Sequence, residues 1–398
     1  MLTVTEARNQ ILQQARSFGA ETILLSESFD RILAEDVCAD RDYPPFNRSA
    51  MDGYALKFND IDRYKEFRLV GEMLAGEGIK SLKEEGTCIK IMTGAPVPEG
   101  ADLVIRVEDS ELKDGMVKFK SYPSRCWQNI AIRGEDAKSG EKVLQKSTII
   151  NASTSGLLAS LGKNLVSVYS LPKVAIISTG NEIKSAGDIV LPHQIRDSNS
   201  YTIASFFQHY YIDIVSRQLV SDRKVDIKNV IKSLDEVDIL ILSGGVSMGD
   251  ADFVPEVLSD CGVKEVFHKV QIKPGKPLWF GVRDNKTVVF ALPGNPVSCQ
   301  VAFKVFIEPF LRACFGLSPC QTIKLPLAGN RKKKSSFEEY FPCALGPFGS
   351  QTGLLPIKNN GSGDFTSVTR SFGLAMQPAE IEELKEGDFV EFIPWKGI

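Results

Sequence analysis

The chain has 398 residues, of which 43% are hydrophobic and 24% are charged, a composition typical of folded globular proteins that excludes a disordered or fibrous chain. Because hydrophobic cores stop growing near roughly 250 to 300 residues, this length predicts two to four domains. The 47 basic and 50 acidic residues give a net charge of -3, which provides no positive field and so argues against nucleic-acid and membrane partners. Eight cysteines without a CxxC pair favour reduced thiols, so we expect a cytoplasmic protein.

The first part of the chain predicts a helical domain interrupted by a β-rich module. Thr3 and Glu6 have the spacing of a capping box, and apolar residues then recur with helical period. Between 43 and 133, short alternating apolar runs are separated by Gly, Pro and Asp-Gly turns, and a second helical stretch follows. We therefore predict an elongated helical linker domain made of 1–42 and 134–171, with a β-rich domain inserted at 43–133.

The rest of the chain predicts an α/β domain followed by a small β domain. From 172 to 316, apolar strands alternate with helices, which indicates a mostly parallel sheet covered on both faces. In such sheets ligands bind beyond the carboxyl ends of the strands. The segment 317–398 is rich in Gly, Pro and short strands and predicts a β-barrel-like domain. The expected fold class is thus a four-domain α/β protein.

Three strands of the predicted α/β domain run into polar exits that contain glycine, with the sequences TGNEI, SGGVSMGDADF and LPGNP. Such an exit lets backbone N–H groups approach a ligand, and the positive end of a following helix favours an anion. We expect Asn295 to cap the last helix and Pro296 to occupy its first position. The candidate ligand-binding residues of the last two exits are Ser243, Gly244, Gly245, Ser247, Gly249, Asp250, Pro293, Gly294, Asn295 and Pro296.

Charged residues near these exits suit an anion bridged by a divalent cation. Asp250 and Asp252 add carboxylates to the SGGVSMGDAD loop. Lys269, Lys273 and Lys276 lie on KVQIKPGKP, where two prolines restrict the backbone and favour contact with phosphate or another oxyanion. Taken singly, LPGNP could be only a stiff turn, and the two acids only a solvated loop.

The only dense basic run, Arg331 to Lys334, is interpreted as a solvated loop because like charges repel and stay exposed. The predicted β module contains PPFNRSAMDGYAL and IMTGAPVPEGAD, but Asp-Gly turns often only reverse a strand, so these stretches alone define no catalytic spacing. The HxH, HExxH and GxxxxGK[ST] signatures are absent.

Eight segments, taken together and in chain order, resemble one family. They are PPFNRSAMDGYA, IMTGAPVPEGAD, IRGEDAKSGE, ISTGNEI, DSNSY, SGGVSMGDADF, IKPGKP and LPGNPVS. The chain is similar to the molybdopterin molybdenumtransferases, the MoeA family, which includes the carboxyl-terminal domain of gephyrin. The resemblance implies an L-shaped homodimer of four-domain subunits with a central MogA-like domain. It also implies an active cleft between the α/β domain of one subunit and the inserted β domain of the other.

The same resemblance implies an enzyme that inserts molybdate into adenylylated molybdopterin (molybdopterin-AMP) and releases AMP, with Mg²⁺ as its divalent ion and the molybdopterin adenylyltransferase as a protein partner. The residues important in the family fall on Asp52, Thr93, Asp136, Glu182, Asp222, Asp252, Lys269, Lys273, Pro293 and Pro296. Asp222 and Asp252 are our choices for holding Mg²⁺, and lysines suit molybdate oxygens and pyrophosphate charge. Glu182 or Asp136 is expected to position water or the dithiolate.

Two alternative functions share parts of this pattern. A gephyrin-like scaffold would keep the fold and bind a protein partner, but it need not retain the full set of acids and lysines. A molybdopterin adenylyltransferase resembles the α/β domain alone, whereas this chain has further domains. One local departure is Asn47, where the family often has an acid. If that acid orients the cleft, its loss would make the cleft less ordered.

Overall fold

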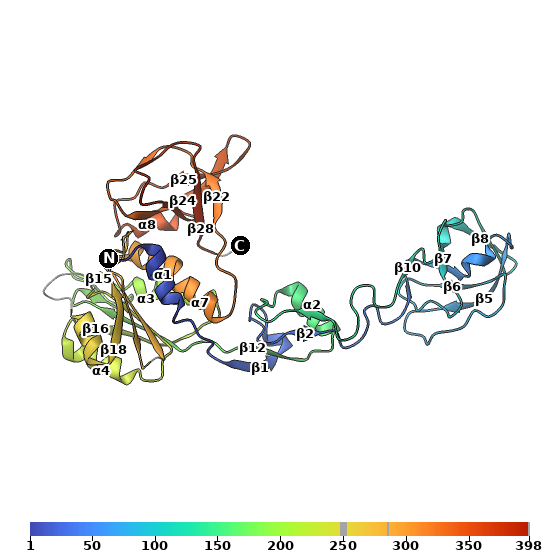
Figure 1. Cartoon of the computed structure of the whole chain (residues 1–398), viewed down its shortest axis with the longest axis horizontal. Coiled ribbons are helices and arrows are strands. Elements are labelled where there is room, and N and C mark those ends of the chain that lie inside the picture. The colour runs from blue at the N-terminus through green and yellow to red at the C-terminus, as the bar shows by residue number, and fades with distance from the viewer. Residues whose placement is uncertain (247–252, 285, 397–398) are drawn as a thin grey trace. The chain divides into compact units, whose positions relative to one another are not determined.

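The computed structural model describes residues 1–246, 253–284 and 286–396 (Figure 1). The chain forms two compact units. The larger unit consists of Met1–Ala34, Ser147–Ala152 and Leu165–Ile398, and the smaller unit consists of Glu35–Lys146 and Ser153–Asn164. The four domain boundaries expected from the sequence stay a prediction.

The larger unit begins with helix α1 (Val4–Leu12), whose start confirms the expected capping box. The hydroxyl of Thr3 accepts the backbone N–H of Glu6 at 3.2 Å, and the Glu6 carboxylate accepts the backbone N–H of Thr3 at 2.8 Å. The two bonds satisfy N–H groups that a helix start leaves without intrahelical partners. A two-stranded pair, β1 (Ala20–Leu24) with β12 (Leu165–Tyr169), belongs to the same unit.

A six-stranded sheet forms the centre of the larger unit, in the order β16-β13-β17-β21-β20-β18. Its strands are β13 (Val174–Thr179), β16 (Ile214–Val220), β17 (Ile239–Ser243), β18 (Val263–His268), β20 (Trp279–Arg283) and β21 (Thr287–Leu292). The first four strands in this order are parallel, and β20 and β18 are antiparallel to their neighbours. Strand β20 had no counterpart in the sequence prediction. It is followed at once by β21, and so short a connection can join only antiparallel neighbours.

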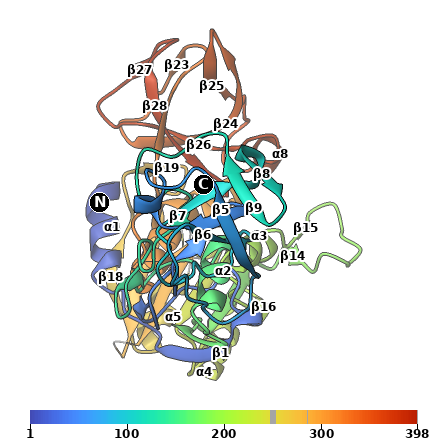
Figure 2. The same ribbon diagram turned by 90° about the vertical axis from the view of Figure 1, so that its right-hand side faces the viewer.

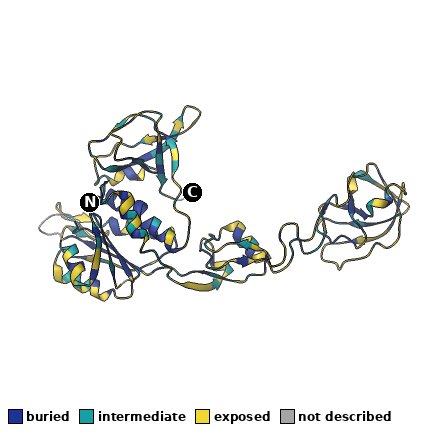
Figure 3. Ribbon diagram, in the orientation of Figure 1, coloured by how far each residue is buried: buried dark blue, intermediate teal, exposed yellow. Residues whose placement is uncertain are grey.

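Helices cover both faces of this sheet, and Figure 3 shows its strands largely buried. The helices are α3 (Asn199–Gln208), α4 (Lys224–Ser233), α5 (Val254–Asp260), α6 (Pro296–Ala302) and α7 (Glu308–Cys314). One core contains apolar residues of α1, α3, α6 and α7, and the other contains those of α4 and α5. The segment Phe303–Ile307 between α6 and α7 is a π-helix, so the single helix expected there is interrupted.

The carboxyl-terminal part of the larger unit is built on a second sheet, in the order β19-β24-β26-β28-β22, with β25 paired to β24. Its elements are β19 (Ile272–Lys273), β22 (Ile323–Pro326), β24 (Glu338–Phe348), β25 (Gln351–Pro356), β26 (Gly373–Gln377), β28 (Phe389–Pro394) and helix α8 (Phe365–Thr369). Strand β19 comes from the KPGK segment, so this segment is part of the carboxyl-terminal sheet. Two short pairs complete the unit: β23 (Arg331–Lys332) with β27 (Glu383–Leu384), and β14 (Ile183–Lys184) with β15 (Ile195–Arg196). The β14–β15 pair lies at the base of a projecting loop (Figure 2).

The smaller unit contains a six-stranded sheet in the order β7-β4-β6-β5-β9-β8. These strands are β4 (Gly53–Leu56), β5 (Phe67–Met73), β6 (Thr87–Ile91), β7 (Leu103–Arg106), β8 (Ser110–Lys113) and β9 (Met116–Phe119). The unit also contains the pairs β2 (Val37–Cys38) with β11 (Lys142–Leu144) and β3 (Arg48–Ser49) with β10 (Ile130–Ala131), and most of helix α2 (Ala152–Ser160). Two 3₁₀ turns of this unit lie at Phe58–Asp60 and Val107–Asp109, and one of the larger unit lies at Leu25–Glu27. Among the described residues of the whole chain, no helix is long and apolar enough to cross a membrane.

A buried ion pair accompanies the π-helix of the larger unit. Lys304 and Glu308 are 3% and 5% exposed and contact each other. The Lys304 ammonium also donates to the Trp395 carbonyl oxygen at 3.3 Å, and the Tyr210 hydroxyl donates to Glu308 Oε1 at 3.1 Å. The pair therefore joins the last helix of the core to the segment that follows α3 and to Trp395 near the end of the chain.

We predict that Lys304→Met lowers the free energy of unfolding by about 3 to 5 kcal/mol, because it leaves the Glu308 carboxylate buried without its cation. Urea denaturation followed by tryptophan fluorescence measures the change. The matched control is Lys224→Met, which removes an exposed pair with Glu256 on the surface of the same unit. That variant is expected to change stability by less than about 1 kcal/mol. Equal effects of the two substitutions would contradict the prediction.

Candidate active site

The carboxyl ends of three parallel strands meet at one edge of the central sheet, as the sequence predicted. Ser243 at the end of β17 pairs with Ser178 of β13 on one side and with Leu292 of β21 on the other. The backbone N–H of Gly244 donates to the Leu292 carbonyl oxygen at 3.0 Å. Gly244 has φ +99°, and a Cβ added there would lie 2.5 Å from the Thr179 carbonyl oxygen. Only glycine fits this approach of two backbones.

Asn199, the first residue of α3, connects two of these exits. Its Nδ2 donates to the Ser243 hydroxyl and to the Gly294 carbonyl oxygen, both at 2.8 Å, and the residue is 7% exposed. The Cys299 thiol donates to the Pro293 carbonyl oxygen at 3.0 Å and fixes the second exit from the other side. Sequence reasoning assigned no role to Asn199, although the DSNSY motif contains it. A buried amide with both donors used on backbone and hydroxyl oxygens is a positioning residue.

The start of α6 differs from the expectation in one respect. Asn295 occupies the N-cap position and Pro296 the first helical position, but the Asn295 side chain makes no capping hydrogen bond. The expected side-chain cap is therefore wrong. The N–H of Val297 donates instead to the Ser362 carbonyl oxygen at 3.1 Å. A carbonyl group of the carboxyl-terminal part thus accepts the hydrogen bond from the first turn of α6 that the Asn295 side chain does not accept.

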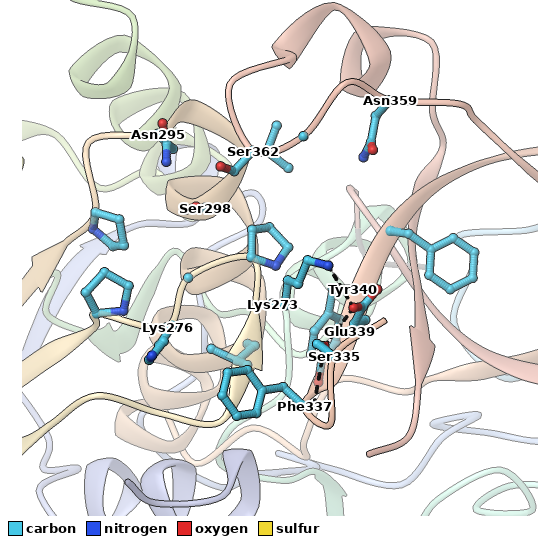
Figure 4. A pocket seen from close by; sticks show the side chains of 18 of the residues that line it. Lys273, Lys276, Asn295, Ser298, Ser335, Phe337, Glu339, Tyr340, Asn359 and Ser362 are labelled. Carbon is cyan, nitrogen blue, oxygen red and sulfur yellow. Dashed lines mark hydrogen bonds and ion pairs between the residues drawn. The ribbon is translucent and has the colours of Figure 1, made fainter. Parts of the chain in front are cut away.

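A cavity of about 560 Å³ lies beside this corner, within the larger unit (Figure 4). The polar residues that line it are Lys273, Lys276, Asn295, Ser298, Arg331, Ser335, Glu339, Tyr340, Asn359 and Ser362. Its charged lining consists of three cations and one carboxylate. The cavity therefore favours an anionic ligand. Prolines of the KPGKP and LPGNP segments also line it, which keeps the backbone of both segments fixed.

The run Arg331 to Lys334 is not a solvated loop, so that interpretation is wrong. Arg331 begins β23, lines the cavity, and lies with its guanidinium 4.1 Å from the ring centroid of Phe341. Lys333 is 6% exposed, and its ammonium donates to backbone carbonyl oxygens of two segments. Successive residues of an extended segment point to opposite sides, so Arg331 and Lys333 turn inward while Lys332 and Lys334 stay exposed.

Some predicted site residues gather at this region, and others do not. Lys273, Lys276, Pro293 and Asn295 line the cavity. Ser243, Gly244, Gly245 and Gly294 lie at the strand exits, and Pro296 lines a neighbouring cavity of about 390 Å³ beside α3 and α8. Lys269 does not line the larger cavity. It is half-buried, has φ +75°, and donates its N–H to the Leu278 carbonyl oxygen at 2.8 Å. Ser247, Gly249, Asp250 and Asp252 lie outside the described residues.

Asp222 and Asn181 contact each other at the same edge of the sheet. The Asn181 N–H donates to Asp222 Oδ2 at 3.3 Å, and the Asp222 N–H donates to Asn181 Oδ1 at 3.2 Å. Glu182, which follows Asn181, is exposed. Among the described residues no group of three His, Cys, Asp or Glu side chains is placed to hold a metal ion. Mg²⁺ needs only one or two carboxylates when substrate phosphates and waters complete its shell, so the Asp222 and Asn181 oxygens fit it chemically.

In the smaller unit, Asp52 and Thr93 form one cluster. Asp52 Oδ1 accepts the Thr93 hydroxyl at 2.7 Å and the Thr93 backbone N–H at 2.6 Å. These two bonds, the hydroxyl first, lower the pKa of the Asp52 carboxyl below its ordinary value. Asp136 is exposed, and its N–H donates to the Tyr43 carbonyl oxygen. At the departure from the family pattern, Asn47 Oδ1 accepts the backbone N–H of Arg133 at 2.8 Å.

The sheet, its glycine exits and the cationic cavity define a multidomain α/β protein whose cavity charge favours an anionic ligand. Three family models match the chain: "MoeA N-terminal region (domain I and II)" at 2–162, "Probable molybdopterin binding domain" at 175–313, and "MoeA C-terminal region (domain IV)" at 324–395. The chain belongs to the molybdopterin molybdenumtransferase family, the MoeA family. The family expected from the sequence motifs is confirmed.

Relatives of this family are similar over most or nearly all of the chain. A molybdopterin molybdenumtransferase of Synechocystis is 33% identical over 99% of this chain and 100% of its own length. One of Haemophilus influenzae is 36% identical over 78% of this chain and 77% of its own. The crystal structure of a molybdopterin biosynthesis MoeA protein from Pyrococcus horikoshii has a TM-score of 0.85 and 28% identity, covering 98% of this chain and 99% of that one. These likenesses confirm the multidomain α/β fold class.

We predict that Thr93→Val raises the pKa of Asp52 toward its ordinary value, because the variant loses the hydroxyl and keeps only the backbone N–H. The lowered pKa means that the carboxylate holds Thr93 at neutral pH and releases it as the pH falls through that pKa. Carbon NMR of the labelled carboxyl group measures the titration. Thr93→Ser keeps a hydroxyl and is the control, expected to titrate as the wild type does. An unchanged pKa in Thr93→Val would contradict the assigned cause.

Proposed function

We propose that this protein is a molybdopterin molybdenumtransferase that inserts molybdate into adenylylated molybdopterin and releases AMP. The observation that carries the proposal is the cavity with three cations and several hydroxyls beside the glycine exits. Relatives that match it over almost its full length are named as such enzymes. Neither alternative function is favoured by a feature of the structure, and an adenylyltransferase needs no counterpart of the matched amino- and carboxyl-terminal regions.

Molybdate is a tetrahedral dianion, and the cavity offers it complementary charge. Lys273 and Lys276 come from the KPGKP segment, and Arg331 comes from the carboxyl-terminal part. Each cation gives a charge-assisted hydrogen bond to an oxyanion oxygen, and the guanidinium can give two in parallel. The hydroxyls of Ser298 and Ser335 lie in the same lining and can donate to the remaining oxygens.

The strand exits are the proposed site of the adenylylated substrate. Gly245 and Gly294 have no side chain over their backbone, which lets their N–H groups approach phosphate oxygens closely, whereas the buried Gly244 uses its N–H on the Leu292 carbonyl oxygen. Asp222, with the Asn181 amide oxygen, would hold Mg²⁺ there together with Asp252, and the ion would neutralise phosphate charge and orient the leaving AMP. Lys269, Glu182 and the smaller unit's Asp52, Thr93 and Asp136 stay proposed catalytic residues.

We also propose a homodimer in the cytoplasm that receives its substrate from the molybdopterin adenylyltransferase. The side chains of Ile189, Leu191 and Ile195 on the projecting loop are 96%, 54% and 58% exposed (Figure 2). Exposed apolar side chains gathered on one loop are typical of a surface that a partner covers. All eight cysteines are free thiols, which suits a reducing compartment. Light scattering on the purified protein tests the dimer, and a monomer at micromolar concentration would contradict it.

We expect AMP release and reconstitution of a cofactor-free molybdoenzyme when the protein is incubated with adenylylated molybdopterin, molybdate and Mg²⁺. Lys276→Met should raise the KM for molybdate about tenfold or more, because it removes a cation from the lining. The exposed Lys332 of β23 lies outside the lining, so Lys332→Met is the matched control. Absence of AMP release would overturn the proposed function, and full activity in EDTA would overturn the role of Mg²⁺.

A site shared between two copies predicts complementation between impaired variants. Asp52→Ala removes a proposed residue of the smaller unit, and Lys276→Met removes one of the larger unit. At molybdate concentrations far below KM, a heterodimer of the two, purified through two different tags, keeps one intact site of two and should show about half of the wild-type activity. If each site instead comes from a single chain, the heterodimer will be no more active than the Lys276→Met parent.

A further inference from the structure

Glu339 is the one carboxylate in the described lining of the large cavity, and the sheet holds it in place from both sides. Strand β24 pairs with β19 on one side, which sets Glu339 opposite Lys273, and with β26 on the other, which sets it opposite Gln377. Glu339 is 3% exposed. Because its backbone is paired on both sides, the sheet fixes the Cα of Glu339 in the cavity wall.

The Glu339 carboxylate uses the same cations that we propose for the oxyanion. Its Oε1 accepts the Lys273 ammonium at 3.0 Å and the Ser335 hydroxyl at 2.8 Å, and Figure 4 shows these contacts. Its Oε2 accepts the Arg331 guanidinium at 2.7 Å. Burial raises the pKa of this carboxyl, but the hydrogen bonds from Arg331, Ser335 and Lys273 outweigh burial and lower it. Glu339 is therefore charged at neutral pH.

A purely structural glutamate would connect β23, β24 and β19 and have no effect on a ligand. Two features argue for more than this. The carboxylate itself lines the cavity. Its hydrogen bonds go to Lys273, Arg331 and Ser335, whereas the Lys276 ammonium lies 5.8 Å from the centroid of the Phe337 ring. The cavity thus has a net charge of two positive units, from three cations less one carboxylate. Every anion that enters must share Lys273 and Arg331 with Glu339 or take them from it.

We propose that Glu339 is a built-in counter-anion that competes with the oxyanion for Lys273 and Arg331 and keeps the oxyanion bound weakly enough to be transferred. This inference rests on the proposed function. Very tight binding of the substrate in the ground state does not increase turnover, because it enlarges the free-energy difference between the bound substrate and the transition state. Glu339 lowers the positive potential that the oxyanion meets and occupies one donor each of Lys273 and Arg331, while both cations stay in the lining.

The test uses the full-length protein and two oxyanions of the same shape, molybdate with two negative charges and perrhenate with one. Equilibrium dialysis measures their binding to wild type, Glu339→Gln and Glu339→Asp. Glu339→Gln keeps the size and loses the charge, so we expect about tenfold tighter molybdate binding and about threefold tighter perrhenate binding, since a dianion gains twice the logarithmic change of a monoanion. Glu339→Asp keeps the charge and is expected to bind both oxyanions within about threefold of wild type.

The exposed Glu383 of β27 lies outside the lining, so Glu383→Gln is the matched control and should leave both affinities unchanged. In turnover, Glu339→Gln should lower both KM for molybdate and kcat, whereas a variant that merely disturbs the fold would raise KM. Unchanged or weaker molybdate binding by Glu339→Gln, with wild-type binding intact, overturns the role of Glu339. If the wild type and all three variants bind no oxyanion, the proposed cavity itself is wrong.

Discussion

The parallel pairing of β19 with β24 is the contact on which the larger unit's cavity depends. The first two residues of the IKPGKP segment, Ile272 and Lys273, pair with Glu338 and Glu339 and so join the α/β core to the carboxyl-terminal sheet. A second link lies at the start of α6, where the Val297 N–H donates to the Ser362 carbonyl oxygen. Between these two links the cavity is enclosed by segments far apart in the sequence. Neither part of the unit would form it alone.

Charge in this cavity is arranged by the backbone rather than by free side chains. Lys273 and Glu339 face each other because their strands are in register, and the Arg331 guanidinium lies over the Phe341 ring. Such an arrangement costs little reorganisation when an anion arrives, because the cations are already ordered. The glycine exits are also ordered in advance, because the buried amide of Asn199 donates hydrogen bonds to two of them. The two halves of the proposed reaction thus have preorganised, separate binding groups.

Much of the fold could be predicted from local patterns. Each expected helix and strand of the α/β core has apolar residues at a regular spacing, and these residues are the ones that the core buries. Strand β20, Trp279 to Arg283, was missed although turn residues bound it in the sequence, KPGKP before it and Asp284 and Asn285 after it. The glycine exits were predictable because only glycine allows the positive φ and the close backbone approach that such a turn requires. Asn199 was not, because a buried amide that bridges two turns leaves no periodic trace in a sequence.

The cavity shows most clearly what local reasoning omits. A run of four basic residues predicts solvation when only its neighbours along the chain are counted, because like charges repel. In the folded chain Arg331 meets the Glu339 carboxylate at 2.7 Å, and Lys333 meets backbone carbonyl oxygens, so each inward cation has its own acceptor. Those acceptors come from sheet pairing between distant segments. The residues that decide how an oxyanion is held are therefore set by register, which no single stretch of sequence specifies.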